Sequence, residues 1–98
     1  MELDAPSTTL GDLRSPDRYR LLASERRRLT IDILEGTGTA VELVELARGI
    51  VAREDGIEAV DEDAILHVAI ALHHVHLPLI AEMGVVVYDP VARIVRSS

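Results

Sequence analysis

Apolar residues recur along this chain with two different periods. Between residues 16 and 83 they return every three or four positions, which is the spacing of amphipathic helices. Near the C-terminus, residues 85–88 and 93–95 form two short runs rich in β-branched side chains, and the gap between them begins with Asp89-Pro90. Because proline presets φ for a tight turn, this second pattern predicts a β-hairpin.

Four helical segments are predicted before the hairpin. In the first, Ser15 is the cap, Pro16 the first helical residue, and Tyr19 and Leu22 the inward side. The other three helices are predicted from the same apolar spacing and from the residue types at their ends. They cover residues 25–35, 42–53 and 61–83, with a Gly-rich break at 36–38 and a short β-capable stretch at 39–41.

The last of these segments is interrupted by Pro78. Proline has no N–H to bond the carbonyl of His74, so the helix is expected to kink or restart there. Gly84 then supplies the left-handed residue that ends it. Three apolar residues are expected to widen its buried side: Leu66, Ile70 and Leu77. The predicted core consists of Leu29, Ile33, Leu43, Leu46, Ile50, Val68, Leu72 and Ile80.

These elements, in this order, predict an α+β fold, the winged helix-turn-helix. Three core helices are followed by a C-terminal hairpin that forms the wing, and the stretch 39–41 is expected to pair with it. Residues 1–15 have no sustained period and are predicted to be a flexible arm, whereas residues 16–98 form the domain. A chain of 98 residues fits one such domain.

The residue types limit the possible environments. There is no cysteine, so disulfides and thiolate metal sites are excluded. Glu2 and Asp4 stand where a secretory signal needs positive charge. The longest apolar segment, residues 64–80, holds four histidines and Pro78, which disfavours a membrane span. A cytoplasmic protein that does not bind membranes is therefore expected.

The chain is strongly acidic: seventeen Asp and Glu residues face ten basic residues, all of them Arg, for a net charge of −7. Lys, Phe and Trp are absent. Such a composition is typical of a protein from a halophile that accumulates salt, because molar salt screens the repulsion among surface carboxylates. The alternative is an ordinary acidic protein from a GC-rich genome, which also favours Arg over Lys.

Three stretches carry a family resemblance. The run LHHVHLPLIAEMGVVVYD, residues 72–89, is similar to a signature segment of small haloarchaeal winged-helix domains that form a family of unknown function. SERRRLTIDILE (24–35) and VELVELARGIVARE (41–54) resemble the first two helices of those domains. The 72–89 segment also resembles, more distantly, the recognition helix and turn of arsenic-repressor-type regulators. This resemblance implies DNA-binding transcriptional regulation.

The four histidines are the residues most suited to metal chemistry. His73 and His76 stand three apart and His67 and His74 seven apart on a helix, with Asp63 four residues before His67. Histidines on such a helix also pack, cap or contact phosphate, and that use is favoured, so no metal or cofactor is predicted. The chain has no nucleophile elbow and no phosphate-binding glycine loop, and it is not predicted to be an enzyme.

Nucleic-acid binding is the favoured function from the sequence. The arginines of the hairpin would contact phosphate, and one side of the long helix would enter the major groove. That side, made of His67, Ala71, His74 and Pro78, has no Arg, Asn or Gln to read bases. With the positive run of the helix at 25–35, the predicted DNA-binding residues are Arg26, Arg27, Arg28, His67, His74, Arg93 and Arg96.

Two alternatives stay open. The Arg run could be a solvated face paired with Asp32 or Glu25. The winged helix could also serve protein association without DNA, with the arm and first helix pairing two chains; a homodimer is expected in either case. A common face holding Arg93, Arg96 and one residue of the run would favour double-stranded DNA. Acidic residues flanking the long helix would favour association.

Overall fold

The structure is a computed structural model that describes residues 15–98. The predicted arm, residues 1–15, therefore lies outside the described part except for Ser15. The described chain has helices followed by a hairpin, in the order expected. Its elements are α1 (Ser15–Leu22), α2 (Glu25–Thr37), β1 (Val41–Glu42), α3 (Leu43–Asp55), the 3-10 turn η2 (Ile57–Ala59), α4 (Glu62–Ala71), the π-helical turn η3 (Leu72–His76), α5 (Leu77–Glu82), β2 (Val86–Asp89) and β3 (Ile94–Ser97).

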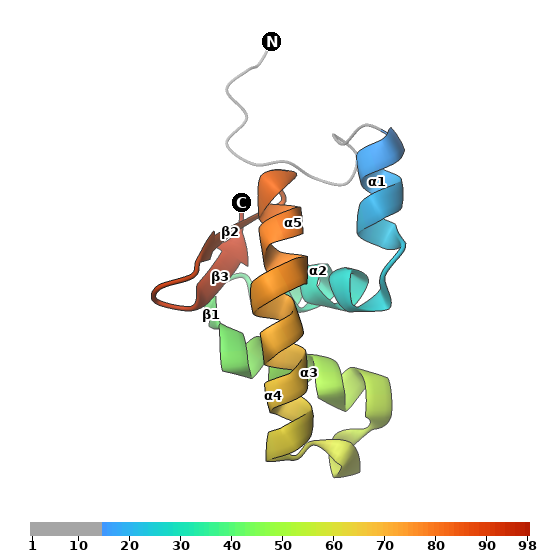
Figure 1. Cartoon of the computed structure of the whole chain (residues 1–98), viewed down its shortest axis with the longest axis vertical. Coiled ribbons are helices and arrows are strands. Elements are labelled where there is room, and N and C mark those ends of the chain that lie inside the picture. The colour runs from blue at the N-terminus through green and yellow to red at the C-terminus, as the bar shows by residue number, and fades with distance from the viewer. Residues whose placement is uncertain (1–14) are drawn as a thin grey trace.

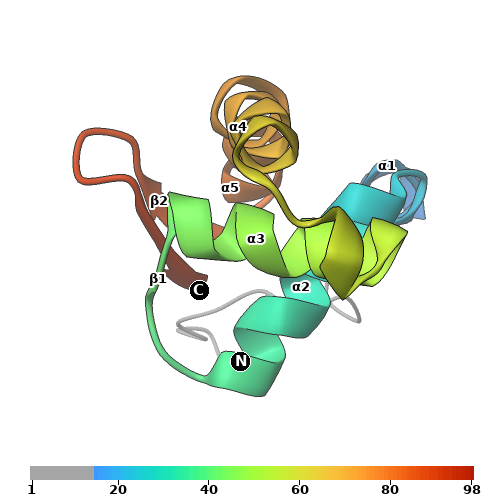
Figure 2. The ribbon, with the colours of Figure 1, turned by 90° about the horizontal axis from the view of Figure 1, so that it is seen from below.

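The three strands form one antiparallel sheet in the order β1-β3-β2. The central strand β3 pairs with both neighbours through Val95, which lies opposite Val41 on β1 and Tyr88 on β2. Figure 2 shows α3 lying between α2 and α4, and in Figures 1 and 2 the sheet lies to one side of the helices. The result is an α+β fold whose order of helices and strands is compatible with a winged-helix layout.

Local capping explains where the helices begin and end. The Ser24 hydroxyl accepts the Arg27 N–H at 3.4 Å at the start of α2. The Asp61 carboxylate accepts the Ala64 N–H at 2.8 Å at the start of α4. Each of these bonds satisfies a donor that the first helical turn leaves unpaired. Gly84 follows α5 with a φ of 83°, so the predicted left-handed stop is confirmed.

The core lies among α2, α3, the long helix and the inner side of the sheet. Of the predicted core residues, Leu43, Leu46, Ile50, Val68, Leu72 and Ile80 are buried. Leu29 and Ile33 are only half-buried, because the buried side of α2 is centred on Ile31 instead. Thr30 can join that side because its hydroxyl donates to the Arg26 carbonyl at 2.8 Å.

Helix α1 is anchored by Leu21, which is fully buried. Tyr19 is 76% exposed, so the prediction that it faces inward is wrong. A helix of eight residues carries too few apolar positions to define its inward side, and the contact with α2 decides it. Leu22, the other residue predicted to face inward, has a side chain that the structure does not describe.

The long helix runs from Glu62 to Glu82 in three segments. In η3 the N–H of Leu77 bonds to the carbonyl of Leu72, five residues back. Helix α5 restarts at Leu77 with Pro78 in its first turn, a position where a missing N–H is tolerated. The predicted interruption at Pro78 is thus confirmed, and Figure 1 shows that the helix continues beyond it as one column.

The π turn changes which residues of this helix face the core. In an uninterrupted α-helix Leu77 would lie about 140° from Leu72, well away from the buried side. With one extra residue in the turn, Leu77 stacks above Leu72, and both are fully buried, as is Ile80. The turn therefore aligns the apolar side of α5 with that of α4.

The loop of the hairpin lies one residue further along the chain than the gap between the two predicted runs, residues 89–92. Strand β2 ends at Asp89 and β3 begins at Ile94, so residues 90–93 connect them. The Asp89 carboxylate accepts the backbone N–H groups of Val91 and Ala92 at 3.0 and 3.1 Å. Arg93 closes the loop with a φ of 59°, a left-handed conformation that few residues other than glycine adopt.

Candidate functional site

A hollow of about 250 Å³ opens where α4, the start of α3 and the hairpin meet. We call it the α4 hollow. Five of its lining residues are apolar, and the other three are two histidines and one arginine. None of its lining residues is acidic, although the chain carries seventeen acidic residues. The lining consists of Leu43, Val44, Leu66, Ala69, Ile70, His73, His74 and Arg93.

Leu66 and Ile70 belong to this hollow and not to the core. They are 56% and 48% exposed, so the prediction that they widen the buried side of the long helix is wrong. The core contacts the neighbouring side of α4, through Ile65 and Val68. Helix α4 is thus apolar on two sides, and the described part of the chain covers one of them.

This second apolar side could have been found in the sequence. Leu66 and Ile70 stand four residues apart and between the positions of the core stripe, so they define a stripe of their own. Assigning every apolar position of the helix to one wide core side concealed it. The signal is therefore a count of apolar residues that exceeds what one buried side of a helix can hold.

The same excess is present over the whole helix Glu62–Glu82. Among the described helices it is the one long and apolar enough to cross a membrane. Only 33% of its most apolar stretch is buried within the described structure. The core helix of a small domain would bury most of such a segment. The long helix therefore carries more apolar surface than the described chain covers.

The π turn places two histidines at the rim of the α4 hollow. His73 Nδ1 lies 2.6 Å from the hydroxyl of Tyr88 on β2, and the His73 ring meets the His74 ring edge-on at 4.8 Å. Burial raises the pKa of the Tyr88 hydroxyl, while Arg93 acts against that shift. Tyr88 therefore stays neutral and joins the long helix to the hairpin.

Arg93 connects the hairpin to the start of α3. Its carbonyl accepts the Leu43 N–H at 2.9 Å, and its own N–H donates to the Asp89 carbonyl at 2.7 Å. Its left-handed conformation costs an arginine about 1–2 kcal/mol that glycine would not lose. Strain of this kind is concentrated at functional positions. Here it occurs at a residue that lines the α4 hollow.

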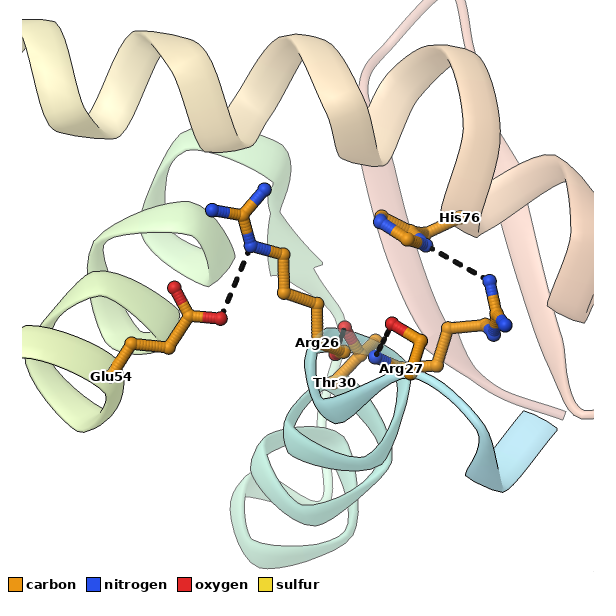
Figure 3. Close-up of polar contacts among 6 residues, drawn as sticks. Arg26, Arg27, Thr30, Glu54 and His76 are labelled. Atoms are coloured by element: carbon orange, nitrogen blue, oxygen red, sulfur yellow. Dashed lines mark hydrogen bonds and ion pairs between the residues drawn. The ribbon is translucent and has the colours of Figure 1, made fainter.

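The positive run of α2 points in several directions. Arg26 Nε pairs with Glu54 Oε2 on α3 at 3.1 Å. Arg27 donates through Nε and Nη2 to the Arg20 carbonyl at 3.0 and 2.7 Å, and through Nη1 to His76 Nδ1 at 3.3 Å. Figure 3 shows these two side chains leaving the first turn of α2 toward different helices. Their contacts join α2 to α1, α3 and the π turn.

The other predicted DNA-binding residues lie apart from these. Arg96 lines a hollow at the end of α2, with residues 38–40. His67 is exposed on α4. Of the seven predicted residues, His74 and Arg93 share the α4 hollow. Arg28 lines a hollow along α2 that also contains the acidic residues Glu25, Asp32 and Glu35.

Acidic side chains flank the long helix. The chain has no Arg or Lys from residue 54 to residue 92. Glu82 is exposed at the end of α5. At the other end, around the start of α4, the exposed acidic residues are Asp55, Glu58, Asp61, Glu62 and Asp63.

His76 is half-buried between α2 and the π turn. Burial lowers the pKa of its imidazole, Arg27 and Arg26 lower it further, and Glu54 partly opposes them. Because His76 Nδ1 accepts a hydrogen bond from Arg27, that nitrogen has to be unprotonated. The neutral imidazole is therefore the form that joins the long helix to α2.

Lowering the pH from about 7.5 to 5 is expected to destabilise the fold through His76. The unfolded chain takes up this proton near pH 6.5, whereas the folded chain resists it until a lower pH. The stabilisation is complete above about pH 6.5 and is lost as pH falls through the folded-state pKa. Melting temperatures across this range should therefore fall more steeply for the parent than for His76→Gln. His67→Gln, at an exposed histidine, is the control, and parallel curves for the parent and His76→Gln would contradict the assignment.

Residues 15–98 contain no cluster of side chains suited to bind a metal ion. Within residues 15–98, no three His, Asp or Glu side chains gather closely enough to hold a metal ion. His73 and His76, which stand three residues apart, contact different neighbours: His73 bonds to Tyr88 and His76 to Arg27.

Comparison with known proteins adds a family but no activity. No curated protein and no solved structure matches the chain significantly. A family model does match, over residues 19–96, which include α2, α3, the long helix and nearly all of the sheet. The chain therefore belongs to the family described as a domain of unknown function, DUF7344.

Proposed function

We propose that this chain is a winged-helix module for protein association that forms a homodimer. The observation that carries the proposal is the apolar side of α4 that residues 15–98 leave uncovered, where Leu66 and Ile70 line the α4 hollow together with Val44 of α3. Contiguous exposed apolar surface on a soluble domain is a mark of an interaction site. In a winged helix this region, between the start of the second helix, the third helix and the wing, is the one that otherwise meets DNA.

The distribution of charge supports association over DNA binding. Arg93 and Arg96 line different hollows, and Arg26 and Arg27 make their contacts within the fold. The start of the long helix, which would enter the major groove, is acidic. Because DNA affinity rests mainly on contacts between basic side chains and phosphate, this face is poorly suited to a duplex.

The cellular setting is part of the same proposal. The acidic, Lys-free composition and the resemblance to haloarchaeal winged-helix domains support a cytoplasmic protein of a halophilic archaeon. In molar salt the hydrophobic contribution to association is retained, while long-range attraction between charges is screened.

A DNA-binding transcriptional regulator is the second candidate. The order of helices and strands and the distant resemblance to arsenic-repressor-type regulators favour it, and Arg93 stands on the hairpin beside α4. If this candidate is correct, Arg93→Ala and Arg96→Ala should weaken binding equally for all duplexes, because phosphate contacts do not read bases. His74→Ala should instead alter the preference among sequences.

The experiment that separates the two candidates compares self-association with DNA binding in the full chain. Sedimentation equilibrium from about 1 to 100 µM protein is expected to show a monomer–dimer equilibrium. Titration into random and genomic duplexes, from about 0.1 to 3 M KCl, should show no binding. A parent that stays monomeric would contradict the association proposal, and a duplex bound with the mutational pattern described above would establish the second candidate.

A further inference from the structure

Four exposed residues form one stripe along the long helix, from the start of α4 to the π turn η3. Glu62, Leu66, Ile70 and His74 follow one another at intervals of four residues, so they lie side by side along the helix. The stripe reads acidic, apolar, apolar, imidazole. Arg93 lies at the hollow that the last three of these residues line. The stripe is therefore negative at its first residue and carries its nitrogen donors at the other end.

This stripe is complementary to a second copy of itself that runs in the opposite direction. If a second copy of α4 lies antiparallel across the first, Glu62 faces the partner's His74 and Leu66 faces the partner's Ile70. Each contact then occurs twice about a twofold axis level with Val68. A twofold interface needs a patch that matches its own inverted copy in this way. A parallel arrangement would instead bring the two Glu62 carboxylates together.

We propose that a second copy of this chain covers the stripe, with the two α4 helices packed antiparallel. The proposal rests on the proposed homodimeric association and names the surface that performs it. Rows of residues four apart on two helices pack together in the commonest class of helix contact. The apolar residues would be buried at the centre of the interface, and the carboxylate, imidazole and Arg93 guanidinium would surround them.

This surface differs from the one expected from the sequence. There, the arm and the first helix were predicted to pair two chains. Of that surface the structure describes α1, where Tyr19 is exposed. A stripe on α4 and a patch on α1 make separate predictions, because each can be disrupted by a single exposed substitution that leaves the core intact.

The first test places a charge in each surface. Leu66→Glu and Ile70→Glu should each raise the dimer dissociation constant by roughly tenfold or more, because the carboxylate would have to be buried against an apolar partner. Tyr19→Glu and Val75→Glu, which alter exposed apolar residues outside the stripe, should dimerise as the parent does. Circular dichroism spectra should be the same for all five proteins.

The second test uses the inverted order of the stripe. Glu62→Arg and His74→Glu should each dimerise poorly alone. The first places an arginine opposite the partner's His74, and the second places a glutamate opposite the partner's Glu62. An equimolar mixture of the two variants should form a heterodimer. In that heterodimer the introduced arginine of one chain meets the introduced glutamate of the other, and the second contact is of the parental kind. His67→Glu and Glu82→Arg are the matched controls, and the measurements use the lowest salt concentration at which the parent is folded.

The outcomes separate the surface from the function. A dimer that Leu66→Glu and Ile70→Glu leave unchanged, or that Tyr19→Glu dissociates, overturns the α4 stripe while homodimeric association stands. A mixture of the two charge variants that remains monomeric overturns the antiparallel arrangement. A parent that is monomeric, or that is recovered with phosphatidylcholine vesicles, overturns both the surface and the proposed function.

Discussion

Dialysis of the full chain from molar KCl to about 0.01 M salt is expected to lower its melting temperature by roughly 10 °C or more. The reason is the uneven distribution of charge. Exposed acidic residues from Asp55 to Asp63 surround the start of α4, and no Arg or Lys occurs between residues 54 and 92. At about 0.01 M salt the Debye length is about 30 Å, so every pair of carboxylates in this region repels. A total repulsion of about 2 kcal/mol would produce a shift of this size.

Two measurements distinguish screening from a general effect of solutes. The recovery of the melting temperature should be nearly complete by a few tenths molar KCl, because the Debye length is then already short. Sucrose at the lowest salt concentration strengthens burial but does not screen charge, so it should raise the melting temperature without removing the dependence on KCl. A melting temperature that is constant, or that rises on desalting, would contradict the halophilic interpretation.

Leu77→Ala is expected to destabilise the fold by about 2–5 kcal/mol, the usual result of truncating a fully buried leucine. The effect follows from the π turn. In an uninterrupted helix Leu77 would lie about 140° from Leu72, and its truncation would cost little. With the π turn it stacks above Leu72 in the core. Denaturation by urea, followed by circular dichroism, measures the change in free energy of unfolding.

A neighbouring residue provides the matched control for this substitution. Val75 lies within the π turn and is 55% exposed, so Val75→Ala should change the free energy of unfolding by at most about 0.5 kcal/mol. Equal effects at the two positions would mean that the helix is not in the π-helical register. The pair of variants therefore tests the register of the long helix independently of any function.

Much of the fold follows from local patterns in the sequence. Ser24 and Asp61 act as caps through bonds to residues three positions on, and Gly84 ends the long helix through its own left-handed backbone. Such interactions involve only near neighbours in the chain, which is why the predicted element order is correct. The ends of elements differ from the prediction by one or two residues where pairing with a distant strand decides them, as at Val41–Glu42.

The candidate site was predicted less well, because its residues are defined by what lies opposite them. Arg26 and Arg27 look like a solvated or phosphate-binding run in the sequence, but Glu54 and His76 bind them from other helices. Leu66 and Ile70 look like core residues, but α3 covers a different side of α4. Neither neighbour can be inferred from spacing along the chain.

The sequence by itself determined the order of helices and strands, the interruption at Pro78, the acidic surface and the absence of cysteine chemistry. Each of these depends on residue type or on neighbours within one helical turn. The tertiary structure alone decided that Leu21 and not Tyr19 anchors α1, that the turn before the buried Leu77 is π-helical, and that the described residues leave one apolar side of α4 uncovered. These depend on which surfaces meet across long separations in the chain, because burial, and not local propensity, selects among the faces that an apolar helix offers.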